Sequence, residues 1–444
     1  MLLQPFTLSL SNTSLRLTYA QDLVPAAAAP HILAAAKLFL LPGSTTTTTT
    51  PSILNHPPLQ TPLEYAARVN TDASAAFADN ALLLQTAFET CAEKYPNRPA
   101  LDFLDAFPSN HRVYTYRELN VVAEKLASEL RAVYGTQFGV VPVYMSTSAE
   151  LYISYLAVLK AGLAFSPLPT DAPQQRLEDI LGDIGAGVIL GRGKTPSAVL
   201  AGAVKELGFE MKYFDVEAII RRPPPPTEVA PRTSSSASDV SQLAYVLYTS
   251  GSTGKPKGVQ ITHLSATCSI AANAFTRPLS TNPAAPSRWF QFAAPTFDPS
   301  IMEIFVTLSM GGTLCSADRE LTLTNIEGVA TELRADIMMT TPSLAAVMNP
   351  NQMPTLRSLV VMGEAVVGKV IAGFASDSPT RGIELGDESF TGPRGLANGY
   401  GPTEAAINVT LFEMFAGYRG SIIGPPTETA SLFILDRDRD QDRD

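Results

Sequence analysis

Residues 243–258 read Leu243-Ala244-Tyr245-Val246-Leu247-Tyr248-Thr249-Ser250-Gly251-Ser252-Thr253-Gly254-Lys255-Pro256-Lys257-Gly258. An apolar, β-prone run leads into hydroxyls, glycines and two lysines. The glycines let backbone N–H groups approach phosphate oxygens without an intervening Cβ, while the hydroxyls and Lys257 add donors and positive charge. An ordinary Gly/Ser surface turn is the alternative for the GSTG core alone. Because the whole loop directly follows an apolar run, the segment predicts a buried strand that ends in a polyphosphate-binding loop.

This loop is not a Walker P-loop. That pattern needs a glycine five residues before the GK pair and Ser or Thr after it, whereas here Thr249 and Pro256 hold those positions. GxGxxG is also absent from the loop, which disfavours a dinucleotide-binding fold. Kinase-type and GTPase-type NTPases are therefore disfavoured.

Composition narrows the class of protein further. A length of 444 residues allows two or three structural units, and 45% hydrophobic with 17% charged residues is typical of a globular enzyme. The net charge of -10 repels nucleic acid. The sequence shows no membrane-spanning segment, no basic signal-peptide start and no disulfide framework, so we expect a cytoplasmic protein without nucleic-acid or membrane partners. HExxH and GxSxG are absent, so zinc and serine hydrolases have no support.

The chain divides into a short leading part and a large globular part. Residues 1–41 combine an alternating strand pattern at Leu15–Tyr19 with an alanine-rich helical pattern from 26 to 40. They resemble the end of a condensation domain. Residues 42–80, with a run of threonines, read as a flexible linker. We expect one globular domain at 81–436, with these parts: 81–220, a disordered loop at 221–241, 242–420, and 421–436, followed by a disordered tail at 437–444.

Strand and helix patterns alternate through the globular part. This alternation predicts parallel sheets with crossover helices, hence an α/β fold. The expected strands are 100–104, 140–144, a turn and strand within 161–168, 187–190, 289–293, 313–315, 336–340, 356–362 and 409–415, and the expected helices are 82–91, 114–133, 149–159, 301–308 and 323–333. A polar stretch at 377–394 reads as a surface insertion.

Three further motifs accompany the loop. Phe297-Asp298-Pro299-Ser300 sets a carboxylate among apolar neighbours, Met362-Gly363-Glu364 follows an apolar strand, and Asn398-Gly399-Tyr400-Gly401-Pro402-Thr403-Glu404 joins a Gly-Pro turn to polar groups. Each alone is modest, since the first could be a simple turn and Glu404 a solvated helix start. Taken in order, with YTYREL and LKAGLAFSPL upstream, they resemble the adenylation domains of nonribosomal peptide synthetases, which belong to the adenylate-forming superfamily with acyl-CoA synthetases and luciferases.

The resemblance covers residues 81–436. Residues 288–312, 420–424 and 52–58 look most like fungal siderophore (ferrichrome-type) synthetases. The implied fold has two stacked parallel-type α/β subdomains in αβαβα layers. In the family a small β-barrel, a ribose-binding Thr-Gly-Asp motif and a lid with a bridging lysine follow, but after residue 436 the sequence shows none of them, so we expect an incomplete barrel and no lid.

The resemblance implies a reaction and its cofactors. A carboxylate attacks the α-phosphate of ATP to give an acyl-adenylate, and a phosphopantetheine thiol on a carrier domain, absent from this chain, then takes the acyl group. Condensation and carrier (thiolation) domains of a larger synthetase are the implied partners. The phosphate-loop residues implied to hold the β- and γ-phosphates are Thr249, Ser250, Gly251, Ser252, Thr253, Gly254 and Lys257.

The remaining roles are also implied by the resemblance. Asn398 would bond the adenine, with Gly363, Gly399 and Tyr400 around the ring, Thr403 would contact the α-phosphate, and Glu404 would ligate Mg²⁺. Asp298 would pair with the α-ammonium of an amino-acid substrate, and a buried carboxylate independently needs such a partner. The implied side-chain pocket is apolar and adaptable, with Asn408 as a polar handle and Gly399 leaving one wall open; it comprises Pro299, Met302, Met339, Val360, Met362, Gly399, Ile407 and Asn408.

Three hypotheses remain open from the sequence. The first is ATP-dependent activation of an amino acid by an incomplete enzyme, with acylated hydroxyornithine as a candidate substrate. The second is an acyl-CoA or aryl-acid ligase of the same superfamily. The third is an inactive truncated protein that binds nucleotide. Asp298 favours the first over the second, because a fatty or aryl acid brings no ammonium.

Overall fold

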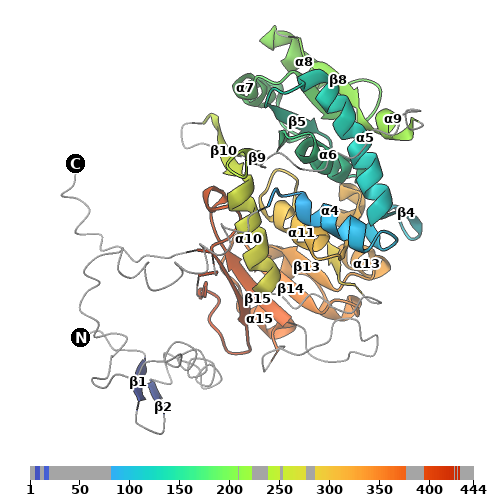
Figure 1. Cartoon of the computed structure of the whole chain (residues 1–444). Coiled ribbons are helices and arrows are strands. Elements are labelled where there is room, and N and C mark those ends of the chain that lie inside the picture. Colours follow the sequence, from blue (N-terminus) through green and yellow to red (C-terminus); the bar gives the residue numbers. More distant parts are fainter. Residues whose placement is uncertain are drawn as a thin grey trace, which may run out of the picture.

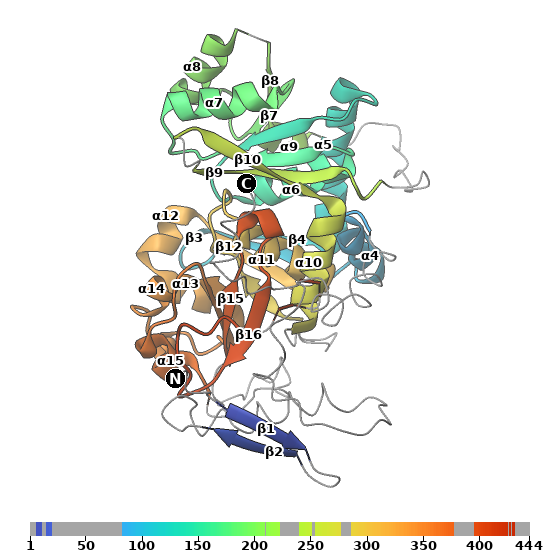
Figure 2. The same cartoon turned by 90° about the vertical axis from the view of Figure 1, so that its left-hand side faces the viewer.

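The computed structural model describes residues 6–10, 15–19, 82–208, 210–222, 239–250, 254–276, 286–376, 395–424, 426–427 and 429–430. Among these residues, two large sheets stack with helices between and outside them (Figures 1 and 2). The predicted α/β fold with two parallel-type subdomains is confirmed. Near the N-terminus, β1 (Phe6–Leu10) and β2 (Leu15–Tyr19) form an antiparallel pair, which includes the predicted first strand. The helix predicted at 26–40 lies outside the described residues.

The smaller sheet has the strand order β10-β9-β6-β5-β7-β8. β5 to β9 run parallel, and β10 pairs antiparallel with β9 at one edge. Its strands are β5 (Val140–Tyr144), β6 (Ala164–Pro167), β7 (Val188–Gly191), β8 (Lys212–Asp215), β9 (Leu243–Ser250) and β10 (Pro256–Thr262). Helices α5 (Tyr116–Tyr134), α6 (Ala149–Lys160) and α9 (Val216–Arg221) pack on its inner face, and α7 (Gln174–Ile184) and α8 (Ala198–Leu207) on its outer face.

The larger sheet has the strand order β16-β15-β14-β13-β11-β12-β3-β4. Only its two edge pairs, β3–β4 and β15–β16, are antiparallel. Its strands are β3 (Pro99–Ala106), β4 (Asn110–Thr115), β11 (Arg288–Phe290), β12 (Thr313–Ala317), β13 (Ile337–Thr340), β14 (Ser358–Met362), β15 (Gly395–Tyr400) and β16 (Thr410–Met414). Helices α4 (Thr86–Lys94), α10 (His263–Thr276) and α11 (Pro299–Ser309) contribute to the core between the sheets. Helices α12 (Arg319–Thr324), α13 (Ile326–Glu332), α14 (Pro342–Ala345) and α15 (Gly368–Phe374) cover the outer face.

Two helices, α6 and α11, form the centre of the layered core. Nearly every residue of each is buried, including polar ones, because both helices lie between the sheets. Aromatic rings join the layers here: the Phe165 ring stacks on Tyr155 at 4.2 Å and on Tyr245 at 5.6 Å, with Phe305 of α11 at 6.4 Å. A helix that is covered on every side is expected to be apolar around its whole circumference, as these two largely are.

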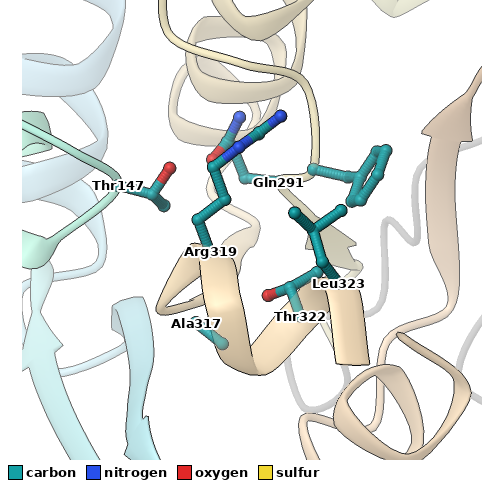
Figure 3. Close-up of a pocket in the computed structure, with 7 residues that line it drawn as sticks. Thr147, Gln291, Ala317, Arg319, Thr322 and Leu323 are labelled. Atoms are coloured by element: carbon teal, nitrogen blue, oxygen red, sulfur yellow. The ribbon is translucent and has the colours of Figure 1, made fainter. Parts of the chain in front are cut away.

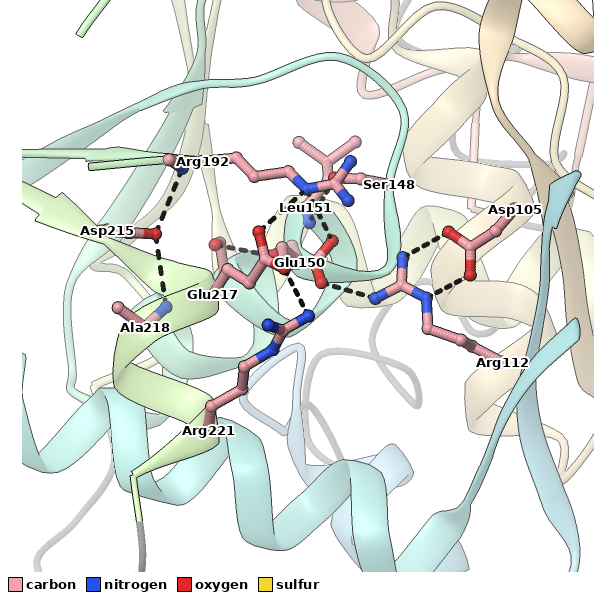
Figure 4. A network of polar contacts seen from close by, with 12 residues as sticks. Asp105, Arg112, Ser148, Glu150, Leu151, Arg192, Asp215, Glu217, Ala218 and Arg221 are labelled. Atoms are coloured by element: carbon pink, nitrogen blue, oxygen red, sulfur yellow. Dashed lines mark hydrogen bonds and ion pairs between the residues drawn. The ribbon is translucent and has the colours of Figure 1, made fainter. Parts of the chain in front are cut away.

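An ion-pair network around the buried Glu150 also ties the two halves together (Figure 4). Glu150 of α6 is 1% exposed, and its Oε1 accepts a hydrogen bond of 2.6 Å from Arg112 Nη1 on β4 of the larger sheet. Arg112 also binds Asp105, at 2.5 and 2.9 Å. Arg192 Nε lies 3.6 Å from the second Glu150 oxygen. The buried carboxylate is thereby paired from both subdomains, and Glu217 and Arg221 extend the network at the surface.

The structure corrects several sequence expectations. The helix predicted at 323–333 is two helices, because Asn325 ends α12 and its side chain caps α13 by accepting from Gly328 N at 3.1 Å. The sequence predicts a loop over 249–258, but Thr249 and Ser250 end β9 and Lys257 belongs to β10. In the predicted barrel, the described residues 421–424, 426–427 and 429–430 form only an isolated bridge between Thr410 and Pro426. The insertion at 377–394, most of the 221–241 loop and the 437–444 tail lie outside the described residues.

Candidate active site

The phosphate loop joins β9 and β10 as a hairpin. Ser250 is opposite Pro256 and Thr249 is opposite Lys257, whose carbonyl accepts from Thr249 Oγ1 at 3.5 Å. Ser250, Gly254 and Lys257 are exposed, so their polar groups are available to an anion. The intervening Gly251, Ser252 and Thr253 lie outside the described residues. The segment between the two strands runs from 251 to 255, so it is shorter than the predicted loop of 249–258.

A cross-strand pair fixes this hairpin. Tyr248 on β9 is opposite Gly258 on β10, and a Cβ at Gly258 would lie 3.1 Å from the Tyr248 ring. Glycine at 258 lets the ring cross the neighbouring strand. The Tyr248 hydroxyl donates to Asp183 Oδ2 of α7 at 2.5 Å. The base of the loop is thus anchored to an outer helix of the smaller sheet.

Asp298 occupies the start of α11 without capping it. The residue is 7% exposed and its carboxylate makes no hydrogen bond to the helix N-terminus, although Asp is a favoured cap. Its Oδ2 is buried and has no partner among the described residues. Burial raises the pKa of Asp298 to about 7 and the Glu404 charge adds to the rise, while hydrogen bonds from the Thr403 side chain and from a backbone N–H oppose it. The Asp298 carboxylate is therefore only partly satisfied: it has hydrogen bonds from Thr403 and the backbone, while its buried Oδ2 has none among the described residues.

Thr403 and Glu404 belong to a short 3-10 turn, η3 (Thr403–Ala405). Glu404 is exposed and Thr403 half-buried, so both can meet a ligand. The turn ends in an unusual backbone: Ala406 and Ile407 have φ of 57° and 85°. Positive φ is rare and strained for a β-branched residue such as Ile407, and such strain gathers at functional sites.

The adenine candidates lie at the carboxyl ends of two parallel strands. Gly363 follows β14, has φ 88° and open space around its Cα, while Tyr400 ends β15 and is 51% exposed. Asn398 on β15 is buried, and its Nδ2 donates to the Ile422 carbonyl at 2.8 Å. This bond fixes the amide and leaves Oδ1 as the acceptor. The predicted residues from β14, β15 and η3 are therefore brought to one edge of the sheet.

The predicted side-chain pocket is apolar, but two of its features differ from expectation. Met302, Met339, Val360, Met362 and Ile407 are all buried, and Pro299 is half-buried. The space above Gly399 is filled, because a Cβ there would lie 2.8 Å from Met362 Cγ. The open wall predicted at Gly399 is therefore wrong for this conformation.

Asn408 is likewise not a free polar handle. Its Nδ2 donates to Asn273 Oδ1 at 3.0 Å and to the Thr410 carbonyl at 3.1 Å, and its Oδ1 accepts from Asn273 Nδ2 at 2.8 Å. Both asparagines are almost fully buried. The reciprocal amide pair ties α10 to the segment after η3. It engages both the Nδ2 and the Oδ1 of Asn408, the amide that the sequence predicts as a hydrogen-bonding group for a substrate.

Tyr245 lies near Asp298 and is not among the residues that the sequence predicts for the site. It is fully buried on β9, and its hydroxyl has no hydrogen-bond partner among the described residues. Burial raises its pKa, and the Asp298 charge raises it further, so the two groups lie within electrostatic reach. The signal was present, since Tyr245 and Leu247 alternate with Val246 and Tyr248 along one strand, but an apolar run gives no reason to single out one tyrosine.

A separate small pocket lies near the ends of β11 and β12, lined by Thr147, Gln291, Phe292, Ala317, Arg319, Thr322 and Leu323 (Figure 3).

Within the described part of the chain, no group of three or more His, Cys, Asp or Glu side chains could hold a metal ion. None of the helices described has both the length and the apolar character needed to span a bilayer.

Comparison with known proteins identifies the family. Residues 88–443 match the family model described as "AMP-binding enzyme". The chain is 47% identical over 404 residues to "Nonribosomal peptide synthetase sidC" of Aspergillus fumigatus, covering 87% of this chain, and 40% identical over 370 residues to "Siderophore peptide synthetase fer3" of Mycosarcoma maydis, covering 79%. It spans only 8% and 7% of those relatives.

Solved structures show the same fold at low identity. The AMPPNP-bound form of the nonribosomal peptide synthetase FmoA3 aligns with a TM-score of 0.63 at 21% identity, covering 83% of this chain and 38% of that one. The N-terminal subdomain of Klebsiella oxytoca NpsA aligns with a TM-score of 0.55 at 21% identity, covering 75% and 76%. The chain belongs to the AMP-binding enzyme family, as an adenylating ligase domain of the nonribosomal peptide synthetase type related to fungal siderophore synthetases.

Proposed function

We propose that this chain activates an amino acid with ATP, as an aminoacyl-adenylate, for nonribosomal synthesis of a siderophore peptide. The observation that carries the proposal is the buried, unpartnered Oδ2 of Asp298. An uncompensated buried carboxylate costs free energy unless a cation or hydrogen bonds satisfy it. The α-ammonium of an amino acid supplies both, because its three N–H donors and its charge match an acceptor-only group.

The remaining groups have positions that suit ATP. Thr249, Ser250, Gly254 and Lys257 of the hairpin would hold the β- and γ-phosphates, with Gly251, Ser252 and Thr253 completing the loop. Thr403 would donate to the α-phosphate as charge develops there, and fixed donors of this kind stabilise a transition state without reorganisation. Asn398 Oδ1 would accept from the adenine amino group, between Gly363 and Tyr400.

Mg²⁺ fits this arrangement as a partner of the nucleotide. Glu404 offers one exposed carboxylate close to Thr403 and Asp298. Mg²⁺ typically binds through one or two carboxylates plus substrate phosphates and waters, so one protein ligand is compatible with it. The ion would neutralise phosphate charge when bound, and Glu404 would set its place.

The apolar pocket favours an uncharged substrate side chain. Met302, Met339 and Met362 are flexible and can rearrange around a ligand, while Asn408 is already bonded to Asn273. We therefore propose an amino acid of limited side-chain polarity, with acylated hydroxyornithine as a candidate from the siderophore relatives. Met362 must move from above Gly399 if a long side chain is to enter.

Aryl-acid activation is the second candidate. The solved NpsA N-terminal subdomain is in complex with 3-hydroxybenzoyl-AMSN, and it shares the fold of this chain. That ligand's acyl group is an aryl acid, which has no α-ammonium to pair with a carboxylate. The buried charge of Asp298 favours the amino-acid reading for this chain.

Carrier and condensation domains of a larger synthetase are the proposed partners. The relatives are peptide synthetases of much greater length, and one solved neighbour is an artificially fused adenylation–PCP di-domain. We propose that the acyl group passes to a phosphopantetheine thiol on such a carrier, in the cytoplasm.

Binding measurements on the 444-residue chain test the proposal. We expect a non-hydrolysable aminoacyl-adenylate analogue to bind at least tenfold more tightly than the matched analogue with the α-ammonium replaced by hydrogen. Asp298→Asn should remove this preference while leaving AMP affinity within about twofold. Equal binding of both analogues to the unmodified chain would contradict the amino-acid reading and favour an aryl or acyl substrate.

A further inference from the structure

Glu303 is a fully buried acid that the proposed chemistry does not use. It lies on α11, five residues after Asp298, and is 0% exposed. Its carboxylate accepts hydrogen bonds from three N–H groups: Phe292 N at 3.2 Å, Ala293 N at 3.1 Å, and Gln291 Nε2 at 2.8 Å. These hydrogen-bond partners are all neutral. Burial raises the pKa of Glu303 to about 8, opposed by the same N–H donors.

Gln291 extends this contact to the other subdomain. Its Oε1 accepts from the Tyr152 hydroxyl of α6 at 2.6 Å, and the Tyr152 oxygen lies 2.6 Å from Ser316 Oγ on β12. Gln291 Nε2 also donates to the Ala293 carbonyl at 2.6 Å. Helix α6 of one subdomain and strand β12 of the larger sheet therefore both contact, through Tyr152 and Ser316, the segment that follows β11.

That turn leads directly to the substrate carboxylate. Residues 291–298 connect β11 to α11, and their last residue is Asp298. Glu303 holds the first half of the segment through two backbone amides. Ser300 holds the second half, since its Oγ donates to the Phe297 carbonyl at 2.7 Å. Asp298 is the last residue of this segment, and Met302 lies one turn further along, inside α11.

The cost of burying Glu303 favours a positional role for this side chain over a stabilising one. Burying an ionisable side chain among neutral partners is costly, and an apolar residue of similar volume often gives an equally stable fold. A carboxylate can accept several N–H groups at once, which an apolar side chain cannot do. Its presence here is explained if the 291–298 segment must be held in one conformation.

We infer that Glu303 is a positioning residue for amino-acid recognition: by accepting from Phe292 N, Ala293 N and Gln291, it fixes the 291–298 segment and so the placement of Asp298. The inference rests on the proposed function for its second half, since Asp298 is there assigned to the substrate ammonium. Its first half, the fixing of the segment, stands on the contacts alone.

The test uses two substitutions and two readouts on the full chain. Glu303→Met keeps the volume but accepts nothing, and Glu303→Gln keeps one acceptor oxygen. Ser309→Ala, at the far end of the same helix, is the matched control because Ser309 Oγ only bonds the Val306 carbonyl. The first readout is backbone hydrogen exchange across 291–298. The second is the affinity for AMP and for a panel of aminoacyl sulfamoyl-adenosines, covering the twenty proteinogenic amino acids and acylated hydroxyornithine.

We expect Glu303→Met to speed exchange in 291–298 by at least tenfold, with peptides of β5, β6 and β14 unchanged. The tightest panel member should bind at least tenfold more weakly, AMP within about twofold, and Glu303→Gln should recover part of both losses. Unchanged exchange in 291–298 would overturn the inference, and so would equal losses for AMP and the panel member, which indicate a structural role alone.

Failure of the proposed function is a separate outcome. If no panel member binds the unmodified chain more tightly than AMP, amino-acid recognition is wrong, while the exchange data still decide whether Glu303 fixes the segment. Should Glu303→Met not fold, Tyr152→Phe removes the far hydrogen bond of the same network and is expected to shift both readouts in the same direction by a smaller factor. No shift in either readout for Tyr152→Phe and Glu303→Gln would then reject the inference.

Discussion

Replacing Asp298 with asparagine should make the ligand-free protein more stable at pH 8. The carboxyl group has a pKa of about 7 in the folded chain, against a reference value of 3.8. Because the folded state binds this proton more tightly, ionisation of Asp298 disfavours folding, and stability falls as pH rises from about 4 to about 7. Asparagine has nearly the same shape and cannot ionise, so it escapes this cost.

The size of the effect follows from the shift. About three pH units at 1.4 kcal/mol each give an upper value of about 4 kcal/mol at pH 8 and nearly zero at pH 4. Chemical denaturation of both proteins across this range measures it. Glu303 and Asp336 also have raised pKa values, of about 8 and about 7, so each absolute profile is composite. The difference between the two proteins isolates Asp298.

Two outcomes would refute the reasoning. A variant that is less stable than the parent at pH 8 would mean that Asp298 Oδ2 has a partner in the free protein that offsets the cost of its burial. A stability difference that does not change with pH would mean that Asp298 does not titrate in this range. Either result would remove the main support for a bound ammonium, whereas the expected result describes a site whose function conflicts with its stability.

Three further substitutions probe the supports of the site. Gly258→Ala sets a Cβ 3.1 Å from the Tyr248 ring, so unfolding free energy should fall by about 1–3 kcal/mol and AMPPNP affinity with it; a neutral effect on both would show that the hairpin adapts. Arg112→Met leaves Glu150 with only the weaker Arg192 contact and should cost about 2–4 kcal/mol in urea denaturation, which Glu150→Met in the same chain should largely restore. Asn273→Ala and Asn408→Ala should be non-additive by about 0.5–3 kcal/mol in a double-mutant cycle, and additive losses would show that the amide pair is not coupled.

The layered fold was predictable because burial marks the sequence. The apolar runs that became β5, α6 and α11 could be assigned nearly to the residue, since these elements are covered on all sides. β10 was missed because Pro256, Lys257 and Gly258 are poor strand residues, tolerated only at an edge. The edge strand β4, the strands β8 and β15 and the helices α7 to α10 and α15 were not assigned either.

Within the site, some placements could be predicted better than the contacts of each residue. Asp298 lies close to Thr403 and Glu404, although 105 positions separate Asp298 from Thr403 in the sequence, while the roles of these residues stay predictions. Asn408, read as a polar handle, is instead bonded to Asn273, which is 135 positions away in the chain. No local pattern announces such a partner, and the same is true of Met362 filling the space over Gly399.

The two classes of buried polar group in this site differ in their purpose. Asn273 and Asn408 hydrogen-bond to one another, so they fix this part of the structure and need no hydrogen bond from a ligand. Asp298 Oδ2 and the Tyr245 hydroxyl are equally buried but have no partner among the described residues. A buried polar atom left without a hydrogen bond costs about 1–3 kcal/mol, and more when charged. A ligand that brings donors recovers this free energy on binding, whereas an apolar acid of the same shape does not. Selectivity for an ammonium would thus arise from a cost already present in the free protein, and the strength of that selectivity should follow how firmly the 291–298 segment keeps Asp298 from finding another partner.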